Sequence, residues 1–233
     1  MAGDALTTGS WNTVLGYNAL SAEDGGGGNV AIGYQALLVQ DAGADAYNTA
    51  VGTGAGVAMT TGIRNTLVGA QAGDALTTGN YNVAVGYNTL STEDADGRNV
   101  AIGYEALKTL NAGADANNVA VGYSSGYSLS TGVRNIMIGT SSGDTLTTGS
   151  DNIAIGHQAL TTEDAHGKNV AIGTRALEDQ NAGADAYNVA VGYEAGKEVT
   201  TGVQNTIIGG KAGDALTTGG YNTALGYNAL SAE

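Results

Sequence analysis

The chain has 233 residues, including 39 glycines and one tryptophan but no proline, phenylalanine or cysteine. This composition leaves no large aromatic core and excludes disulfide bonds and thiolate metal sites, so it favours a thin, repetitive fold over an ordinary globular domain. The formal net charge of −14 argues against nucleic-acid binding, because neutralising phosphate groups requires a basic surface.

Insertion into a membrane is not indicated by the hydropathy pattern. No apolar run approaches the roughly 20 residues that are needed to cross a bilayer. The first residues lack the basic segment and the apolar stretch of a signal peptide, so we expect any export signal to lie outside this sequence.

One pattern of five residues recurs thirteen times and predicts the fold. Each copy begins with Asn and ends with Gly, and the residues between them are apolar or threonine and mostly β-branched, as in Asn-Val-Ala-Val-Gly at 82–86. β-branched residues favour an extended backbone, so each copy predicts a short strand, and thirteen copies at a short period predict stacked strands. In chain order the asparagines are Asn12, Asn29, Asn48, Asn65, Asn82, Asn99, Asn118, Asn135, Asn152, Asn169, Asn188, Asn205 and Asn222, and the glycines that close their copies include Gly16, Gly33, Gly86, Gly103, Gly156 and Gly226.

The distance between successive asparagines defines the repeat unit. It runs 17, 19, 17 and 17 residues and then repeats, which gives blocks 12–81, 82–151 and 152–221 and a partial block 222–233. We therefore predict an all-β fold, a parallel β-solenoid or β-roll with about one coil per unit of 17–19 residues, and a single repeat array over 1–233. Residues 2–23 recur almost unchanged at 212–233, so a segment of an open array and a subunit with two similar ends both remain possible.

The asparagine of each unit is position 0, and the residues that follow it are positions 1, 2, 3 and so on. Positions 1 and 3 carry Val, Ile or Leu in most units and should line one face of the strand, while position 7 is small and marks a second tightly packed place. Position 8 is Leu in some units and Gly in others, and the units with Gly have Met, Leu or Val at position 11 instead. A structural role explains why Asn and Gly recur in every unit, without any catalytic or binding role. Stacked Asn amides can hydrogen-bond from coil to coil, and Gly permits a close approach of the backbone.

The residue before the asparagine is aromatic or cationic in most units, and the two kinds alternate; the exceptions are Gly28, Asn117, Asp151 and Gln204. With one unit per coil, these residues form a ladder in which cations lie between rings, which avoids stacking like charges about 4.8 Å apart and permits cation–π contacts. With two units per coil, the cations would instead be stacked on one another, so we prefer the coil of one unit. The ladder residues are Trp11, Tyr47, Arg64, Tyr81, Arg98, Arg134, Lys168, Tyr187 and Tyr221.

Acidic residues gather in turns that stacking would bring together. Calcium takes six to eight oxygen ligands from carboxylates and carbonyls in flexible loops, so these turns are candidate calcium sites, with solvated turns as the alternative. Their spacing differs from that of the Asp-rich nonapeptide of calcium-binding β-rolls. The candidate ligands are Glu23, Asp24, Asp41, Asp45, Glu93, Asp94, Asp96, Asp115, Glu163, Asp164 and Asp185.

Other surface residues suggest further functions. Thr-Thr-Gly turns at 60–62, 77–79, 147–149, 200–202 and 217–219 raise the possibility of an ice-binding face, although half of the units carry acidic turns instead. Tyrosines at position 5 can stack on sugars or cover a subunit interface. Both histidines, His157 and His166, stand at ordinary repeat positions, and no catalytic constellation is visible, so we do not expect an enzyme.

At 222–230 (Asn-Thr-Ala-Leu-Gly-Tyr-Asn-Ala-Leu) and 77–87 (Thr-Thr-Gly-Asn-Tyr-Asn-Val-Ala-Val-Gly-Tyr), the chain resembles repeat regions of phage tail-fibre-like proteins. More distantly, it resembles the heads of YadA-like trimeric autotransporter adhesins, in which a related Asn-Ser-Val-Ala-Ile-Gly motif builds a left-handed parallel β-roll and three chains associate. The resemblance covers the whole chain, but the unit here is longer and no neck, stalk, anchor or chaperone domain follows.

What this resemblance implies is a rigid extracellular or virion-associated fibre segment, left-handed and homotrimeric, that presents a surface to cell-surface carbohydrate or protein. A self-assembling filament subunit that stacks end to end is the alternative from a different class. An ice-binding solenoid is a further, weaker alternative.

Overall fold

The computed structural model describes residues 1–95, 97–113 and 115–231. Within these residues the regular structure consists of thirteen short parallel strands, and there is no helix. Both findings confirm the predicted all-β solenoid. The chain forms two compact units, Met1–Asn117 and Asn118–Glu233, which are described separately.

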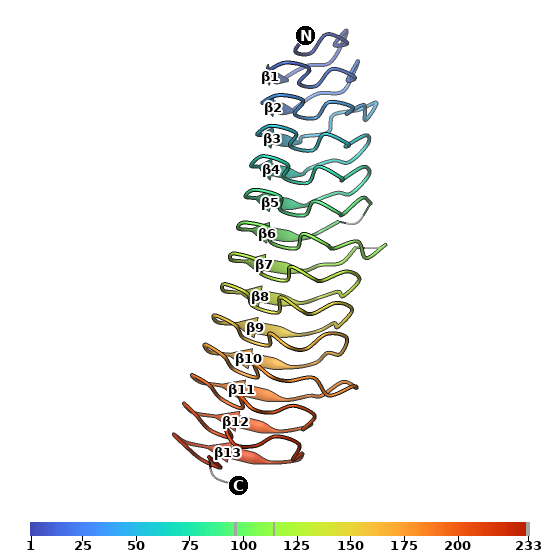
Figure 1. The fold of residues 1–233 in the computed structure, drawn as a ribbon. Helices are drawn as coiled ribbons and strands as arrows, with labels where there is room; N and C mark the ends of the chain where they lie inside the picture. The colour runs from blue at the N-terminus through green and yellow to red at the C-terminus, as the bar shows by residue number, and fades with distance from the viewer. Residues whose placement is uncertain (96, 114, 232–233) are drawn as a thin grey trace. The chain divides into compact units, whose positions relative to one another are not determined.

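The first unit contains six parallel strands that pair in the order of the sequence. Each strand pairs with the equivalent residues one repeat later, for example Val83 with Val100 and Ala84 with Ala101. One repeat therefore makes one coil, as predicted, and successive coils stack on one another (Figure 1). The strands are β1 (Thr13–Leu15), β2 (Val30–Ile32), β3 (Thr49–Val51), β4 (Thr66–Val68), β5 (Val83–Val85) and β6 (Val100–Ile102).

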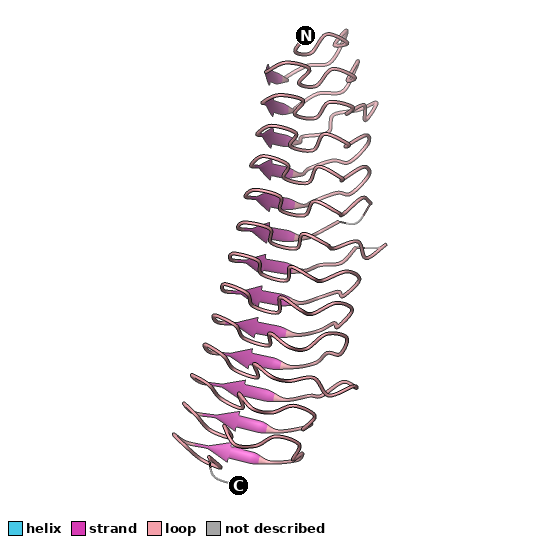
Figure 2. Ribbon diagram, viewed as in Figure 1, coloured by secondary structure: helices cyan, strands magenta, loops and turns pink. Residues whose placement is uncertain are grey.

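The second unit repeats this arrangement with seven strands. Loops make up the greater part of each coil (Figure 2), yet backbone hydrogen bonds join neighbouring coils in the loops as well, from Gly143 N to Ala159 O at 3.0 Å and from Thr200 N to Thr217 O at 2.8 Å. The strands are β7 (Val119–Val121), β8 (Ile136–Ile138), β9 (Ile153–Ile155), β10 (Val170–Ile172), β11 (Val189–Val191), β12 (Thr206–Ile208) and β13 (Thr223–Leu225).

The two faces of the strands differ in burial. The middle residue of nearly every strand is buried, as at Ala84 and Ala101, whereas the Val and Ile residues on either side of it are half-buried or exposed. The side chains at positions 0 and 2 therefore point into the coil, and those at positions 1 and 3 point outward. The core is thin because small alanines fill it, and the bulkier β-branched residues form the outer face of the sheet.

The asparagine at position 0 joins coils through its side chain. In the second unit, the Oδ1 atom of Asn135 accepts a hydrogen bond from the backbone N–H of Asn152 at 3.0 Å, and its Nδ2 donates to the carbonyl of Gly149 at 2.9 Å. The first unit shows the same pattern, with Asn48 Oδ1 accepting from Asn65 N and Asn48 Nδ2 donating to Gly62 O. The predicted hydrogen bonding from coil to coil is thus confirmed. The asparagine side chains bond to backbone N–H and carbonyl groups of the next coil, and some also bond to the neighbouring asparagine amide.

The larger core side chains come from two alternative positions. In coils with Leu at position 8, such as Leu37 and Leu107, this residue is buried although its backbone has a φ of +49°, in the left-handed region. In coils with Gly at position 8, such as the coil of Gly73, a Cβ at that position would lie 2.9 Å from Leu67 Cδ2 and 2.7 Å from Leu76 Cδ1. The alternation noted in the sequence therefore reflects two ways to fill the same space inside the coil.

Candidate functional site

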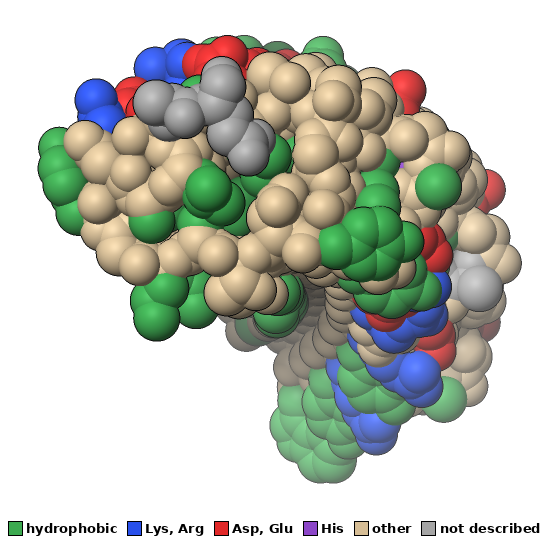
Figure 3. All heavy atoms as spheres, turned by 90° about the horizontal axis from the view of Figure 1, so that it is seen from below, with side chains coloured by type: hydrophobic (Ala, Val, Ile, Leu, Met, Phe, Trp, Pro, Cys, Tyr) green, Lys and Arg blue, Asp and Glu red, His purple; other side chains and the backbone are tan. Residues whose placement is uncertain are grey.

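Contacts of the predicted ladder form in both units. Hydrophobic, basic and acidic side chains gather beside one another on the surface that Figure 3 shows. Arg64 lies over the ring of Tyr81 in the next coil, 5.5 Å from its centre, and donates a hydrogen bond to its hydroxyl group at 2.7 Å. Lys168 lies 5.1 Å from the ring centre of Tyr187 in the same way. The ladder therefore contains the predicted cation–π contacts.

Two other cations of the ladder contact carboxylates instead of rings. Arg134 makes two hydrogen bonds to Asp151, at 2.6 and 2.8 Å, and Arg98 forms an ion pair with Asp115. The hydrogen bonds from Arg134 hold the pKa of Asp151 below its usual value. Trp11 and Tyr221 are the most exposed aromatic residues of the ladder, at 78% and 77%, and Tyr47 lies against Gly28.

The candidate calcium ligands fall into separate groups. Glu23, Asp24 and Asp41 bring carboxylate oxygens within 4.8 Å of one another, as sequence reasoning expected for a stacked pair of turns. Both oxygens of Glu23 already accept backbone hydrogen bonds, Oε1 from Gly26 at 2.6 Å and Oε2 from Ala42 at 3.4 Å. Calcium binding here stays a prediction, since Asp24 and Asp41 would have to supply much of the coordination.

Other candidate ligands are engaged elsewhere or lie outside this group. Asp115 and Asp185 pair with the ladder cations Arg98 and Lys168, and Asp45 accepts a hydrogen bond from the Tyr47 hydroxyl at 3.3 Å. Glu93 is buried at the position of Glu23 in the following block, and Asp94 accepts the Thr77 hydroxyl through its backbone carbonyl. Asp96 lies outside the described residues.

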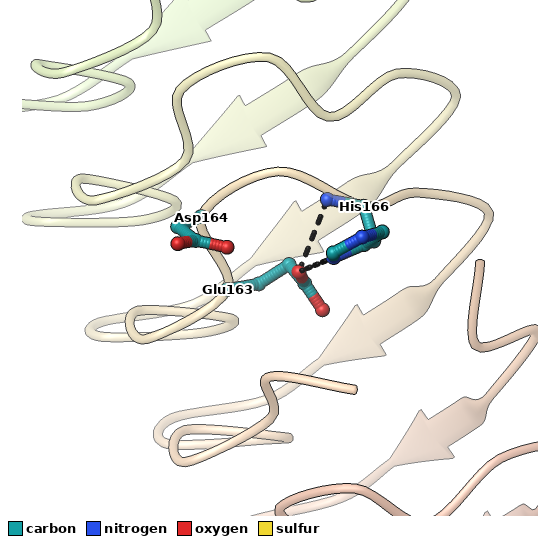
Figure 4. A group of neighbouring side chains, drawn as sticks. All are labelled: Glu163, Asp164 and His166. Carbon is teal, nitrogen blue, oxygen red and sulfur yellow. Dashed lines mark hydrogen bonds and ion pairs between the residues drawn. The ribbon is translucent and has the colours of Figure 1, made fainter. Parts of the chain in front are cut away.

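In the third acidic turn the sequence predicted Glu163 and Asp164 as ligands, but it did not predict the neighbouring His166 or the burial of Glu163. Glu163 lies between Asp164 and His166 (Figure 4), and its Oε1 accepts a hydrogen bond from the backbone N–H of His166 at 3.1 Å and lies 3.4 Å from Nδ1 of the same residue. The Glu163 side chain is fully buried, and its Oε2 has no hydrogen-bond partner. The available signal was that Glu occupies position 11, where coils with Gly at position 8 place Leu, Met or Val.

Burial of Glu163 predicts a specific dependence of stability on pH. Desolvation raises its pKa above the ordinary value of 4.5, although the hydrogen bond from His166 opposes the shift. Because the folded pKa lies above the unfolded one, the folded chain binds the proton more tightly, and stability falls as the pH rises through the folded pKa. We therefore expect Glu163→Gln to raise the melting temperature at pH 7 and to change it little near pH 4.

Thermal unfolding followed by circular dichroism, with a chelator present, measures this effect. Asp164→Asn is the matched control, because it removes a neighbouring but exposed charge and should not reproduce the gain. A lower melting temperature for Glu163→Gln at pH 7 would show that the buried carboxylate is ionised and compensated, contrary to the expectation.

The threonine turns use their hydroxyl groups internally. The hydroxyls of Thr60, Thr77 and Thr147 donate to backbone carbonyls of the next coil, at 3.1, 2.7 and 2.6 Å. A side chain held in this way joins coils, and its hydroxyl proton is not available to order water. The geometry thus adds nothing to the ice-binding alternative.

The tyrosines at position 5 form exposed stacks. Tyr17 and Tyr34 lie 5.8 Å apart between ring centres with an interplanar angle of 11°, and Tyr87 and Tyr104 lie 5.5 Å apart at 21°. Between the two pairs, the row is interrupted by two smaller residues, Thr53 and Ala70. The row therefore offers flat aromatic surfaces with a gap between them in the first unit.

A scan against protein-family models finds no match to this chain, and searches of curated proteins and of solved structures also find no similar protein. In the part of the chain that the structure describes, no helix has the length and hydropathy needed to cross a membrane. The function is accordingly argued from the geometry of the coils and their surfaces.

Proposed function

We propose that this chain is a structural segment of an extracellular or virion-associated fibre, a solenoid that holds its shape and presents a binding surface. The observation that carries the proposal is the bonding between coils: side-chain amides, backbone groups and ladder cations each link a coil to the next, as at Asn135, Gly143 and Arg134. Such a fold gains stability along one axis with every added coil. That property suits a spacer or a display surface better than an enzyme.

The outer face of the strands supports lateral self-association. Val and Ile at positions 1 and 3 leave apolar side chains partly open to solvent, with Ile136 and Ile138 each 37% exposed and Ile208 38% exposed. Val, Ile or Leu recurs at position 3 of every strand, which enlarges the apolar part of this face. Large exposed apolar surfaces on soluble proteins usually mark an interface. We assign this face to contacts between copies of the chain, and we adopt the left-handed homotrimer that the family resemblance implies.

Solution mass combined with electron microscopy tests this proposal. We expect a discrete rod-like species of three times the chain mass of 23.0 kDa. Ile138→Lys together with Ile208→Lys should convert it to monomers, since charges on the outer face cannot be buried without partners. Thr131→Lys together with Thr162→Lys, which adds the same two charges on exposed turns, should leave the mass unchanged. A compact monomeric wild-type chain would contradict the proposal.

End-to-end assembly into a filament is the second candidate. A Cβ on Gly226 would meet no atom within 4 Å, whereas Gly209, one coil earlier, has the backbone of Gly226 stacked against it. Leu225 and Tyr227 are exposed at 74% and 76%. Filaments whose length grows with protein concentration would favour this candidate over a species of fixed mass.

A further inference from the structure

The gap in the tyrosine row of the first unit opens into a pocket. Its volume is about 280 Å³, and Tyr34 forms one of its sides. The residue that interrupts the row one coil later is Thr53, and the next is Ala70. The equivalent of Thr53 in the two later blocks is a tyrosine, Tyr123 or Tyr193, so the first block replaces an aromatic ring by a small side chain at this point.

The pocket combines an apolar side with polar groups. Tyr34, Val57 and Ala70 supply carbon surface, whereas Gln35 and Gln71 supply amides. The space beside Gly54 is open, because the nearest atom to a Cβ at this position would be Gln71 Cγ at 4.0 Å. The lining therefore offers a ring face together with hydrogen-bond donors and acceptors.

One charged residue lines the pocket, the half-buried Asp74. Burial raises the pKa of its carboxyl group above the ordinary value, and its Oδ1 is buried without a hydrogen-bond partner. The pocket lining contains no Lys or Arg to balance this charge. An anionic ligand would consequently be repelled, whereas hydroxyl groups would be attracted as donors.

These features match the chemistry of a neutral sugar ring. A pyranose has an apolar face of C–H groups that stacks on an aromatic ring, and hydroxyl groups at its edge that pair with amides and carboxylates. Pockets for drug-sized ligands span roughly 300–1,000 Å³, so a volume of about 280 Å³ suits a single ring.

We propose that the pocket between Tyr34 and Asp74 binds one neutral pyranose ring, at the end of a glycan chain. The inference rests on the proposed function: a fibre segment presents a binding surface, and this pocket would be the part of that surface that binds the ligand. The tyrosine supplies the stacking platform, and Gln35, Gln71 and Asp74 supply the hydrogen bonds that select hydroxyl groups.

Saturation-transfer NMR with methyl β-D-galactopyranoside, followed by a titration, tests the proposal. We expect binding with a dissociation constant on the order of 1 mM, as befits one small ring. Lactose carries the same ring at the end of a longer sugar and should bind as well. Methyl β-D-glucuronide should not bind, because Asp74 would repel its negative charge and the pocket lining has no Lys or Arg to balance it. Absence of galactoside binding, or equal binding of the glucuronide, would overturn the proposal, and failure of lactose alone would overturn the assignment to glycan ends.

Matched variants locate the binding. Thr53→Tyr should fill the pocket and weaken binding by about tenfold or more, and it introduces the residue found at this position in the later blocks, so folding should be retained. Thr174→Tyr makes the same change at position 5 of a coil in the second unit and should leave binding unchanged. Asp74→Asn should also weaken binding, whereas Asp214→Asn at the equivalent position of the third block should not. Undiminished binding by Thr53→Tyr would overturn the proposal.

The outcomes separate the pocket from the proposed function. A trimeric rod that fails to bind any of these sugars would refute the pocket alone. A compact monomer that binds galactoside and loses this binding with Thr53→Tyr would refute the fibre role while retaining the pocket.

Discussion

Gly86→Ala is expected to be among the most destabilising single substitutions in this chain. Gly86 has a φ of +136°, a region that L-residues rarely adopt, and an added Cβ would overlap the backbone carbonyl of Gly103 in the next coil. The obstacle is main chain that is itself hydrogen-bonded, since Gly103 N donates to Val85 O at 2.8 Å, so it cannot turn aside as a side chain can. Backbone strain and overpacking together should lower the free energy of unfolding by about 3–5 kcal/mol.

Gly226→Ala is the matched control for this prediction. Gly226 occupies the same repeat position with a φ of +122°, but a Cβ there would meet no atom within 4 Å. Its substitution should therefore cost only the backbone strain of about 1–3 kcal/mol. Denaturant unfolding followed by circular dichroism measures both, and equal losses would show that close stacking is not the reason for the glycine column.

The architecture could be predicted because its causes are local and repeated. The Asn and Gly of each unit mark one strand, and the constant interval between asparagines sets the length of the coil, so the strands and their order followed from the sequence. The alternation of Arg64 with Tyr81 favoured one unit per coil over two, because two units per coil would have stacked the cations on one another. This electrostatic argument identified the correct coil, and the parallel register of β4 with β5 confirms it.

Other features depend on geometry that a linear pattern does not contain. Bulk alone does not say which face of a strand is buried, and here the small residue of β5, Ala84, points inward while Val83 and Val85 point outward. The pairing of Arg98 with Asp115, which lies two residues before the ladder position of the next coil, depends on reach between coils. The pocket beside Tyr34 arises from atoms of three coils, although the replacement of tyrosine by Thr53 was its visible sign.

The second large loss of stability is expected for a core substitution, Leu67→Ala, and its size depends on the alternation between Leu and Gly at position 8. Leu67 in β4 is fully buried, and it occupies a space where most other coils have only an alanine. Leu67→Ala should leave a cavity and cost about 2–5 kcal/mol. The absence of a side chain on Gly73 is what leaves room for Leu67, because a Cβ there would lie 2.9 Å from Leu67 Cδ2.

The double variant Leu67→Ala with Gly73→Leu should regain much of the lost stability, because the new leucine fills the cavity that the first substitution creates. It reproduces the combination of Ala101, Leu107 and Leu110 in a later coil of the same unit, all three of them fully buried. Leucine also accepts the required backbone, since Leu107 has a φ of +49° and Gly73 one of +58°. Gly73→Leu alone should destabilise the chain by overpacking against Leu67. A double-mutant cycle measured by denaturant unfolding gives the coupling directly. Additive losses from the two substitutions would mean that positions 2 and 8 do not share one space inside the coil.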